Sequence, residues 1–124
     1  IRDFTYIDDI IESLIRVIEK APTTDSSFEK LNPDPSSSWA PHKIFNIGNS
    51  KPTQLMDFIK ALENSLGKKS KKVFLPLQQG DVPATAANTE LIEKWINFKP
   101  YTPVETGIDR FVMWYKEFYK IMLN

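Results

Sequence analysis

The order of apolar segments between residues 43 and 75 constrains the fold more than any other feature. Residues 43–47 have the composition of a strand, which ends at the turn 48–50. A helix should follow over 52–66, where apolar residues recur at helical spacing and Gly67 stands in the position of a C-terminal glycine cap. Residues 73–75 then predict a second strand. Strand, helix and strand in this order predict a βαβ unit with parallel strands and a right-handed crossover.

Three further segments have the periodicity of amphipathic helices, at 8–20, 89–96 and 103–122. The first is expected to be capped by Asp8 or Asp9, because Glu12 follows Asp9 at the spacing of a capping box. With the helix at 52–66, these segments predict a small α/β fold that has one parallel βαβ unit and about four helices.

Residues 22–42 interrupt this regular pattern with prolines and a cluster of serines. A linker between domains is one interpretation, but only 21 residues precede the segment. We therefore expect a Pro/Ser-rich surface loop within one domain that spans residues 1–124.

The overall charge excludes several classes of function. Lysine plus arginine and aspartate plus glutamate number 16 each, so no net field would attract nucleic acid or an anionic membrane. Four lysines between 68 and 72 fit a solvated turn better than a nucleic-acid patch, because no aromatic residue lies among them. No apolar run is long enough to span a bilayer, and there is no cysteine. A cytoplasmic location is the expectation.

A candidate ligand site follows from the predicted topology alone. Parallel strands end at the same edge of a sheet, so the turn at 48–50 and the segment 76–81 should lie close together. Ligands bind in the crevice beyond such strand ends, and Gln78 and Asp81 supply polar groups there. A Gly-Asp pair after a strand is also typical of an ordinary turn without a ligand. The single histidine, His42, has no neighbouring residues in the sequence pattern that would form a catalytic or metal site with it.

Three stretches together resemble one enzyme family. They are Arg2-Asp3-Phe4-Thr5-Tyr6-Ile7-Asp8-Asp9, Phe45-Asn46-Ile47-Gly48-Asn49-Ser50 and Gly80-Asp81-Val82-Pro83-Ala84-Thr85. In this order they resemble the C-terminal third of the NAD-dependent nucleotide-sugar epimerases of the extended short-chain dehydrogenase/reductase superfamily, most closely the UDP-glucuronate 4-epimerases. The sequence also starts at Ile1, without methionine and in the middle of a motif, as expected for part of a longer protein.

The resemblance implies a substrate site for a UDP-sugar at four residues. Arg2 matches an arginine that contacts the diphosphate, and Asp3 stands beside it in the same motif. Asp81 matches an acid that reaches the nucleotide. Gln78 stands where many relatives have a phosphate-binding arginine, so a phosphate role for it is in doubt. We expect Arg2 and Asp81 to face one crevice.

The same resemblance implies which parts of the enzyme this chain does not carry. In the family NAD⁺ takes a hydride from C4 of the sugar, a tyrosine accepts the hydroxyl proton, and the 4-keto sugar turns over before the hydride returns. The glycines, at 48, 67, 80 and 107, form no dinucleotide fingerprint, and no tyrosine here is followed four residues later by lysine. We therefore expect no catalytic residue, no NAD site and no Rossmann domain in these 124 residues, and no activity from them alone.

Alternatives remain open within and outside this family. A sugar 4,6-dehydratase or an N-acetylhexosamine 4-epimerase would share the motifs, whereas a non-catalytic α/β interaction module would need none of them. The family implies a homodimer for the intact enzyme. The helix at 8–20 and the segment 76–88 should face the rest of a longer protein. In the isolated chain their apolar surface would be exposed to solvent, so we expect that chain to self-associate.

Overall fold

The structure, a computed structural model, describes residues 1–121 as four helices joined by long extended segments. These are α1 (Ile7–Glu19), α2 (Leu55–Leu66), α3 (Glu90–Ile96) and α4 (Val104–Tyr119). The number of helices and their approximate positions confirm the predictions from sequence. Met122, which the predicted last helix included, lies outside the described residues.

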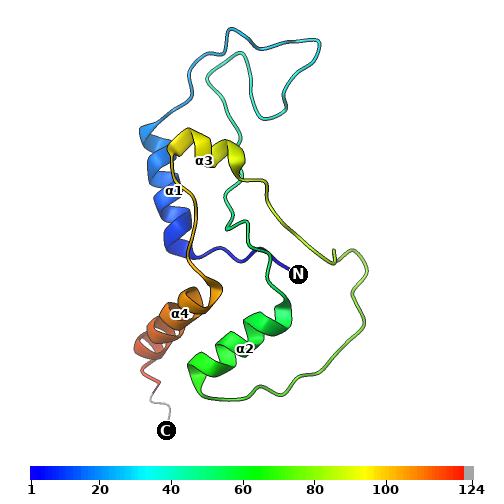
Figure 1. Ribbon diagram of the computed structural model, residues 1–124, viewed down its shortest axis with the longest axis vertical. Helices are drawn as coiled ribbons and strands as arrows, with labels where there is room; N and C mark the ends of the chain where they lie inside the picture. The colour runs from blue at the N-terminus through cyan, green and yellow to red at the C-terminus, as the bar shows by residue number, and fades with distance from the viewer. Residues whose placement is uncertain (122–124) are drawn as a thin grey trace.

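The helices pack in two pairs (Figure 1). Helix α2 lies against α4, and α1 lies against α3. Four aliphatic side chains on α3 and α4 form the buried apolar core of the described residues, namely Ile92, Ile96, Ile108 and Val112. Residues 1–6 run between the two pairs and so hold the molecule together at its middle (Figure 1).

The predicted βαβ unit is not formed in residues 1–121. The described chain contains no sheet, and the first predicted strand, 43–47, has only an isolated bridge from Lys43 to Ser37. The second, 73–75, is exposed in the wide loop between α2 and α3 (Figure 1). A strand requires a neighbour that satisfies its backbone N–H and C=O groups, and these two segments do not meet. The predicted arrangement of these two segments as parallel strands of one sheet is therefore not present in the described residues.

Helix α1 buries two small polar side chains and exposes much of its apolar face. Asp9 and Ser13 are 4% and 0% exposed, whereas Ile7 and Ile18 are 59% and 79% exposed. The predicted cap at Asp8 or Asp9 is wrong, because the N-cap residue is Tyr6, which makes no side-chain cap hydrogen bond. The Asp9 carboxylate instead accepts a hydrogen bond from the Thr102 amide at 2.9 Å.

Residues 22–42 form the predicted irregular loop, which projects beyond α1 and α3 (Figure 1). Its two arms are joined where the Asp25 amide donates to the Trp39 carbonyl at 3.2 Å. The Asp34 carboxylate accepts hydrogen bonds from the Ser36 amide and hydroxyl, which lower the pKa of Asp34. This local bonding gives the loop a defined shape without a helix or a sheet.

The end of α2 contains the clearest agreement between sequence and structure. Gly67 has a left-handed φ of 68°, and its amide donates to the Asn64 carbonyl, as in a glycine C-cap. The lysine run that follows folds back on the helix, where Lys69 and Lys72 pair with Glu63. The run is therefore part of a local clasp.

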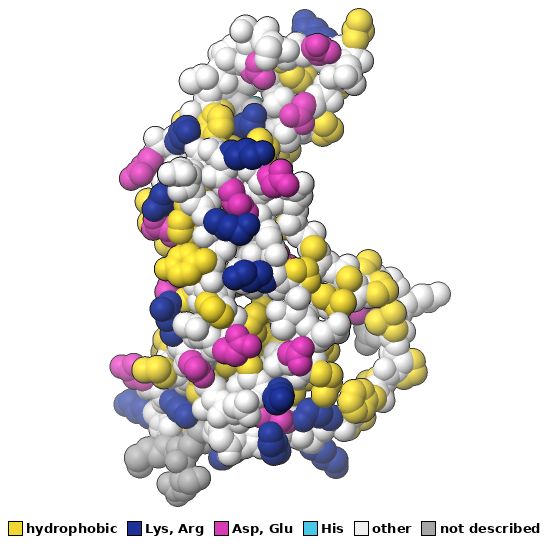
Figure 2. All heavy atoms as spheres, in the orientation of Figure 1, with side chains coloured by type: hydrophobic (Ala, Val, Ile, Leu, Met, Phe, Trp, Pro, Cys, Tyr) yellow, Lys and Arg dark blue, Asp and Glu magenta, His cyan; other side chains and the backbone are white. Residues whose placement is uncertain are grey.

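No helix within residues 1–121 is both long enough and apolar enough to cross a membrane. Apolar side chains nevertheless lie at the surface, including those of the loop that carries Val73, Phe74 and Leu75 (Figure 2).

Candidate functional site

Arg2 and Asp81 meet directly, although they are far apart in sequence. The Arg2 Nη2 atom donates to Asp81 Oδ1 at 2.8 Å, and Nη1 donates to the carbonyls of Ile1 and Val82, each at 2.9 Å. The two side chains are 35% and 47% exposed, so the pair is accessible to solvent. Arg2 and Asp81, which were expected to face one crevice, therefore lie in contact, although the predicted βαβ unit is not formed in residues 1–121.

The segment that carries Asp81 is a turn. The Asp81 amide donates to the Gln78 carbonyl at 3.1 Å, and Gly80 has a left-handed φ of 89°. Asp81 Oδ1 also accepts from the Val82 amide at 2.9 Å, which fixes the carboxylate at the start of the next segment. Gln78 is exposed and contributes its backbone carbonyl to this turn.

Within residues 1–121, Asp3 binds backbone amides and no other side chain. Its Oδ2 accepts a hydrogen bond from the Ser50 amide at 3.0 Å, and its Oδ1 accepts one from the Lys51 amide at 3.2 Å. Arg2 is held beside it, because the Arg2 and Thr53 backbones exchange both hydrogen bonds of an antiparallel bridge, at 3.0 and 2.8 Å. The 48–53 turn therefore fixes the backbone that carries Arg2.

The close approach of Asp3 to this turn requires a glycine at position 48. A Cβ atom on Gly48 would lie 2.8 Å from Asp3 Oδ2 and 3.1 Å from the Cβ of Ala87. Residues 1–5, 47–53 and 81–89 thus converge in what we call the three-segment junction. A cavity of about 220 Å³ lies within it, lined by Asp3, Thr5, Ile47, Gly48, Thr85, Ala86 and Ala87.

A chain of hydroxyl groups extends the junction to α3. Thr89 Oγ1 donates to Glu93 Oε1 at 2.5 Å, and the Ser50 hydroxyl, 2.6 Å from Thr89 Oγ1, therefore donates to Thr89. The Thr89 hydroxyl, followed by Lys99, lowers the pKa of Glu93 against the opposing effect of its partial burial. Glu93 is thus held as a carboxylate that anchors the junction.

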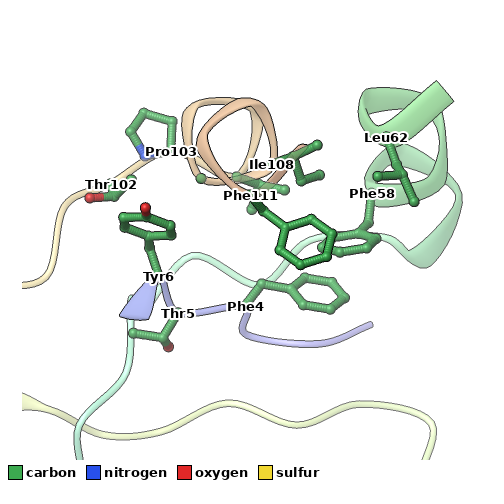
Figure 3. A pocket seen from close by; sticks show the side chains of 11 residues that line it. Phe4, Thr5, Tyr6, Phe58, Leu62, Thr102, Pro103, Ile108 and Phe111 are labelled. Atoms are coloured by element: carbon green, nitrogen blue, oxygen red, sulfur yellow. The ribbon is translucent and has the colours of Figure 1, made fainter. Parts of the chain in front are cut away.

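A second cavity, of about 320 Å³, lies between residues 4–6, α2 and α4. The rings of Phe4, Phe58 and Phe111 face one another there (Figure 3), and Phe4 stacks on Phe58 with ring centroids 4.2 Å apart. No charged side chain lines this cavity, so it offers no partner for a diphosphate. The stacking of Phe4 on Phe58 beside this cavity anchors Phe4, which follows Arg2 by two residues.

Sequence reasoning missed Asn49, which lies in the 48–53 turn and is 1% exposed. Its Nδ2 atom donates to the carbonyls of Phe4, at 3.4 Å, and Thr102, at 3.1 Å. A Gly-Asn-Ser sequence after a strand is typical of an ordinary turn, and no other signal in the sequence marks Asn49 as buried.

The chain is similar along nearly its whole length to several known proteins. It is 47% identical to protein CapI of Staphylococcus aureus over 119 residues, which cover 96% of this chain and 36% of that protein. It is 41% identical to a probable UDP-glucuronate 4-epimerase of Rhizobium meliloti over 121 residues, covering 96% of this chain and 35% of that protein. UDP-glucuronate 4-epimerase 4 of Arabidopsis thaliana is 38% identical over 120 residues, which cover 95% of this chain and 26% of that protein.

This chain therefore spans about a third of the length of the bacterial relatives named above. No family model matches it.

Proposed function

Since this chain is homologous over nearly its whole length to UDP-glucuronate 4-epimerases and to CapI, we propose that it is the nucleotide-sugar-binding part of an NAD-dependent 4-epimerase. The proposed substrate is UDP-glucuronate, which is inverted at C4 through a 4-keto intermediate. The observation that supports this assignment best is the contact between Arg2 and Asp81, because both residues match substrate positions of the family motifs.

Arg2 is suited to binding a diphosphate. Three of the five N–H donors of its guanidinium are used by Ile1, Asp81 and Val82, which leaves donors for phosphate oxygens. The three contacts within the protein also orient the guanidinium before the ligand arrives, so less side-chain entropy is lost on binding. Asp81 then has two roles, to orient Arg2 and to accept hydrogen bonds from ribose hydroxyls.

Asp3 and Gln78 have smaller roles in this proposal. Both Asp3 oxygens accept backbone N–H groups of the 48–53 turn, so Asp3 supports the site through the position of Arg2. Gln78 brings an exposed amide that can donate to a phosphate oxygen but carries no charge.

The residues of this chain do not fit the NAD cofactor. Gly67 caps α2, Gly107 lies in α4 against Tyr6, and Gly48 lies against Asp3. These glycines therefore lie in three separate places and do not form one glycine-rich loop for a dinucleotide. In this proposal the cofactor and the catalytic base belong to the remaining part of a longer protein. This chain contributes binding of the UDP portion, which holds the nucleotide while the sugar reorients.

The experiment replaces Arg2 by alanine in the full-length protein that carries this chain. Loss of a charged contact to phosphate typically weakens binding by about 1.5–3 kcal/mol, so the dissociation constant for UDP should rise roughly ten- to a hundredfold. Calorimetric titration with UDP measures this change, and the affinity for NAD⁺ should not change.

Arg16→Ala is the matched control, because Arg16 pairs with Glu12 on α1, away from the junction. An Arg2→Ala protein that binds UDP as tightly as the parent would refute the site. Turnover of UDP-N-acetylhexosamine, or 4,6-dehydration, in place of UDP-glucuronate epimerisation would retain the family and change the substrate or reaction.

A further inference from the structure

Asn49 is buried beside the proposed site but has no part in the ligand contacts described above. We propose that Asn49 is the positioning residue of the Arg2–Asp81 pair, acting through the backbone of residues 2–4. This inference rests on the proposed function, because it assigns Asn49 to the same UDP-binding site.

The chemistry at this position calls for the asparagine amide. Two backbone carbonyls, those of Phe4 and Thr102, accept hydrogen bonds from the single Nδ2 atom. An amide nitrogen carries two N–H donors, whereas serine and threonine have one and an ionised aspartate has none. Asn49 is therefore the small side chain that can join both carbonyls.

The burial of Asn49 makes these two contacts important. The side chain is 1% exposed, so water cannot replace either hydrogen bond without a local opening. Among the described residues its Oδ1 atom has no hydrogen-bond partner. The amide is thus oriented by its donors alone, and the fold tolerates an unpaired oxygen to keep the two carbonyls joined.

The contacts lead from Asn49 to Arg2 along a short path. The Phe4 carbonyl is held by Asn49, the Asp3 carboxylate by the amides that directly follow Asn49, and the Arg2 backbone by Thr53. Each residue from 2 to 4 is therefore bound to the same turn. Without the Asn49 amide, the attachment at the Phe4 carbonyl is lost and residues 2–4 gain freedom.

The other contact of Asn49 connects this turn to the helices. Thr102, whose carbonyl Asn49 binds, also donates its amide to the buried Asp9 carboxylate of α1. Through Asn49 and Thr102, the backbone that carries Arg2 is therefore connected to α1 and to the segment that precedes α4, as well as to neighbouring loop residues. A guanidinium held in this way can meet a diphosphate without first ordering its own backbone.

A double-mutant cycle in the full-length protein tests this inference. UDP dissociation constants are measured by calorimetry for the parent, Asn49→Ala, Arg2→Ala and the variant with both changes. Asn49→Ala alone should raise the constant roughly tenfold, near the upper limit for loss of neutral hydrogen bonds. Since Asn49 acts through Arg2, the double variant should bind UDP within about twofold of Arg2→Ala.

Asn46→Ala is the matched control, because Asn46 lies in the same motif but is exposed and donates only to the Asn88 carbonyl in the described structure. It should leave UDP binding unchanged. The NAD⁺ dissociation constant should be the same in all variants, which a general loss of structure would not permit.

Independent, additive losses from the two changes, or an equal loss of NAD⁺ affinity, would overturn the role of Asn49. If Asn49→Ala does not fold, Asn49→Ser, which retains one donor, takes its place in the cycle with the same criteria. If Arg2→Ala itself leaves UDP binding unchanged, the proposed function fails, and the positioning role fails with it.

Discussion

Two buried carboxylates, Asp9 and Glu63, hold this molecule together in different ways. Asp9 is 4% exposed and accepts the Thr102 amide across a sequence separation of 93 residues. Glu63 is 8% exposed and accepts from Ser70, Lys69 and Lys72, which all lie within nine residues. The first is a long-range contact between segments, and the second closes a local clasp at the end of α2.

The comparison shows which contacts a sequence can reveal. The lysine run after the helix was predicted as a solvated turn, and its partner Glu63 lies one turn before the end of the same helix, so both members of the contact fall within one short stretch of sequence. Nothing near Asp9 or Thr102 in the sequence indicates that they meet. The predictions below separate these two kinds of contact, beginning with the one expected to have the larger effect.

Asp9→Ala should destabilise the protein most. The change leaves the buried Thr102 amide without its partner, which should lower the free energy of unfolding by about 2 kcal/mol. Urea denaturation measures the loss, and hydrogen exchange at the Thr102 amide should accelerate. Asp8→Ala is the control, because the Asp8 side chain is 67% exposed and its pairing with Arg110 spans 3.6 Å. An equal loss at both positions would show that the long-range contact contributes nothing of its own.

In the folded protein, the Glu63 carboxylate of the clasp should take up a proton only at very low pH. Hydrogen bonds from Lys72 and Ser70 hold the pKa of Glu63 far below its ordinary value of 4.5. A lowered folded-state pKa contributes stability that is present above the unfolded-state value and is lost as pH falls through the folded one. NMR titration of the Ser70 amide should therefore show no transition near the pKa of an ordinary glutamate. Glu63→Gln should abolish the acid transition, and a midpoint at the ordinary value would contradict the clasp.

Gly67→Ala should have the smallest effect. Gly67 has a φ of +68° and no atom within 4 Å of an added Cβ, so only backbone strain opposes the change. We expect a loss of about 1 kcal/mol in the free energy of unfolding. Gly67→Asn is the matched variant and should lose less, because asparagine tolerates the left-handed region. Identical losses for alanine and asparagine would indicate a cause other than φ.

The two segments predicted as strands show a further limit of prediction from sequence. Residues 43–47 are held by contacts that include the Ile44 amide and the rings of Phe45 and Trp95, which lie 5.7 Å apart. Val73, Phe74 and Leu75 are 71–79% exposed. Two segments of similar composition thus differ, since one contacts other parts of the protein and the other is exposed to solvent. Neither is a strand of a sheet, because extended backbone becomes one only when another segment satisfies its hydrogen bonds.

The candidate site shows the same difference between features that are local in sequence and contacts between distant segments. Arg2, Asp3, Gln78 and Asp81 were chosen as candidate site residues from sequence motifs, and of these Arg2 and Asp81 contact each other in the structure. Their supports were not predictable, because Asn49 contacts Phe4 and Thr102 across 45 and 53 residues. The parallel sheet that was expected to bring residues 48–50 and 76–81 together is absent from the described residues.

The sequence alone determined the four helices, the cap at Gly67 and the irregular loop at 22–42, because each depends on residues within one or two turns of chain. Tertiary structure decided that α1 buries Asp9 and Ser13, and that Asn49 joins segments distant in sequence. A buried polar side chain is stable only where the fold supplies its hydrogen-bond partners, and those partners come from parts of the chain whose meeting no local pattern records.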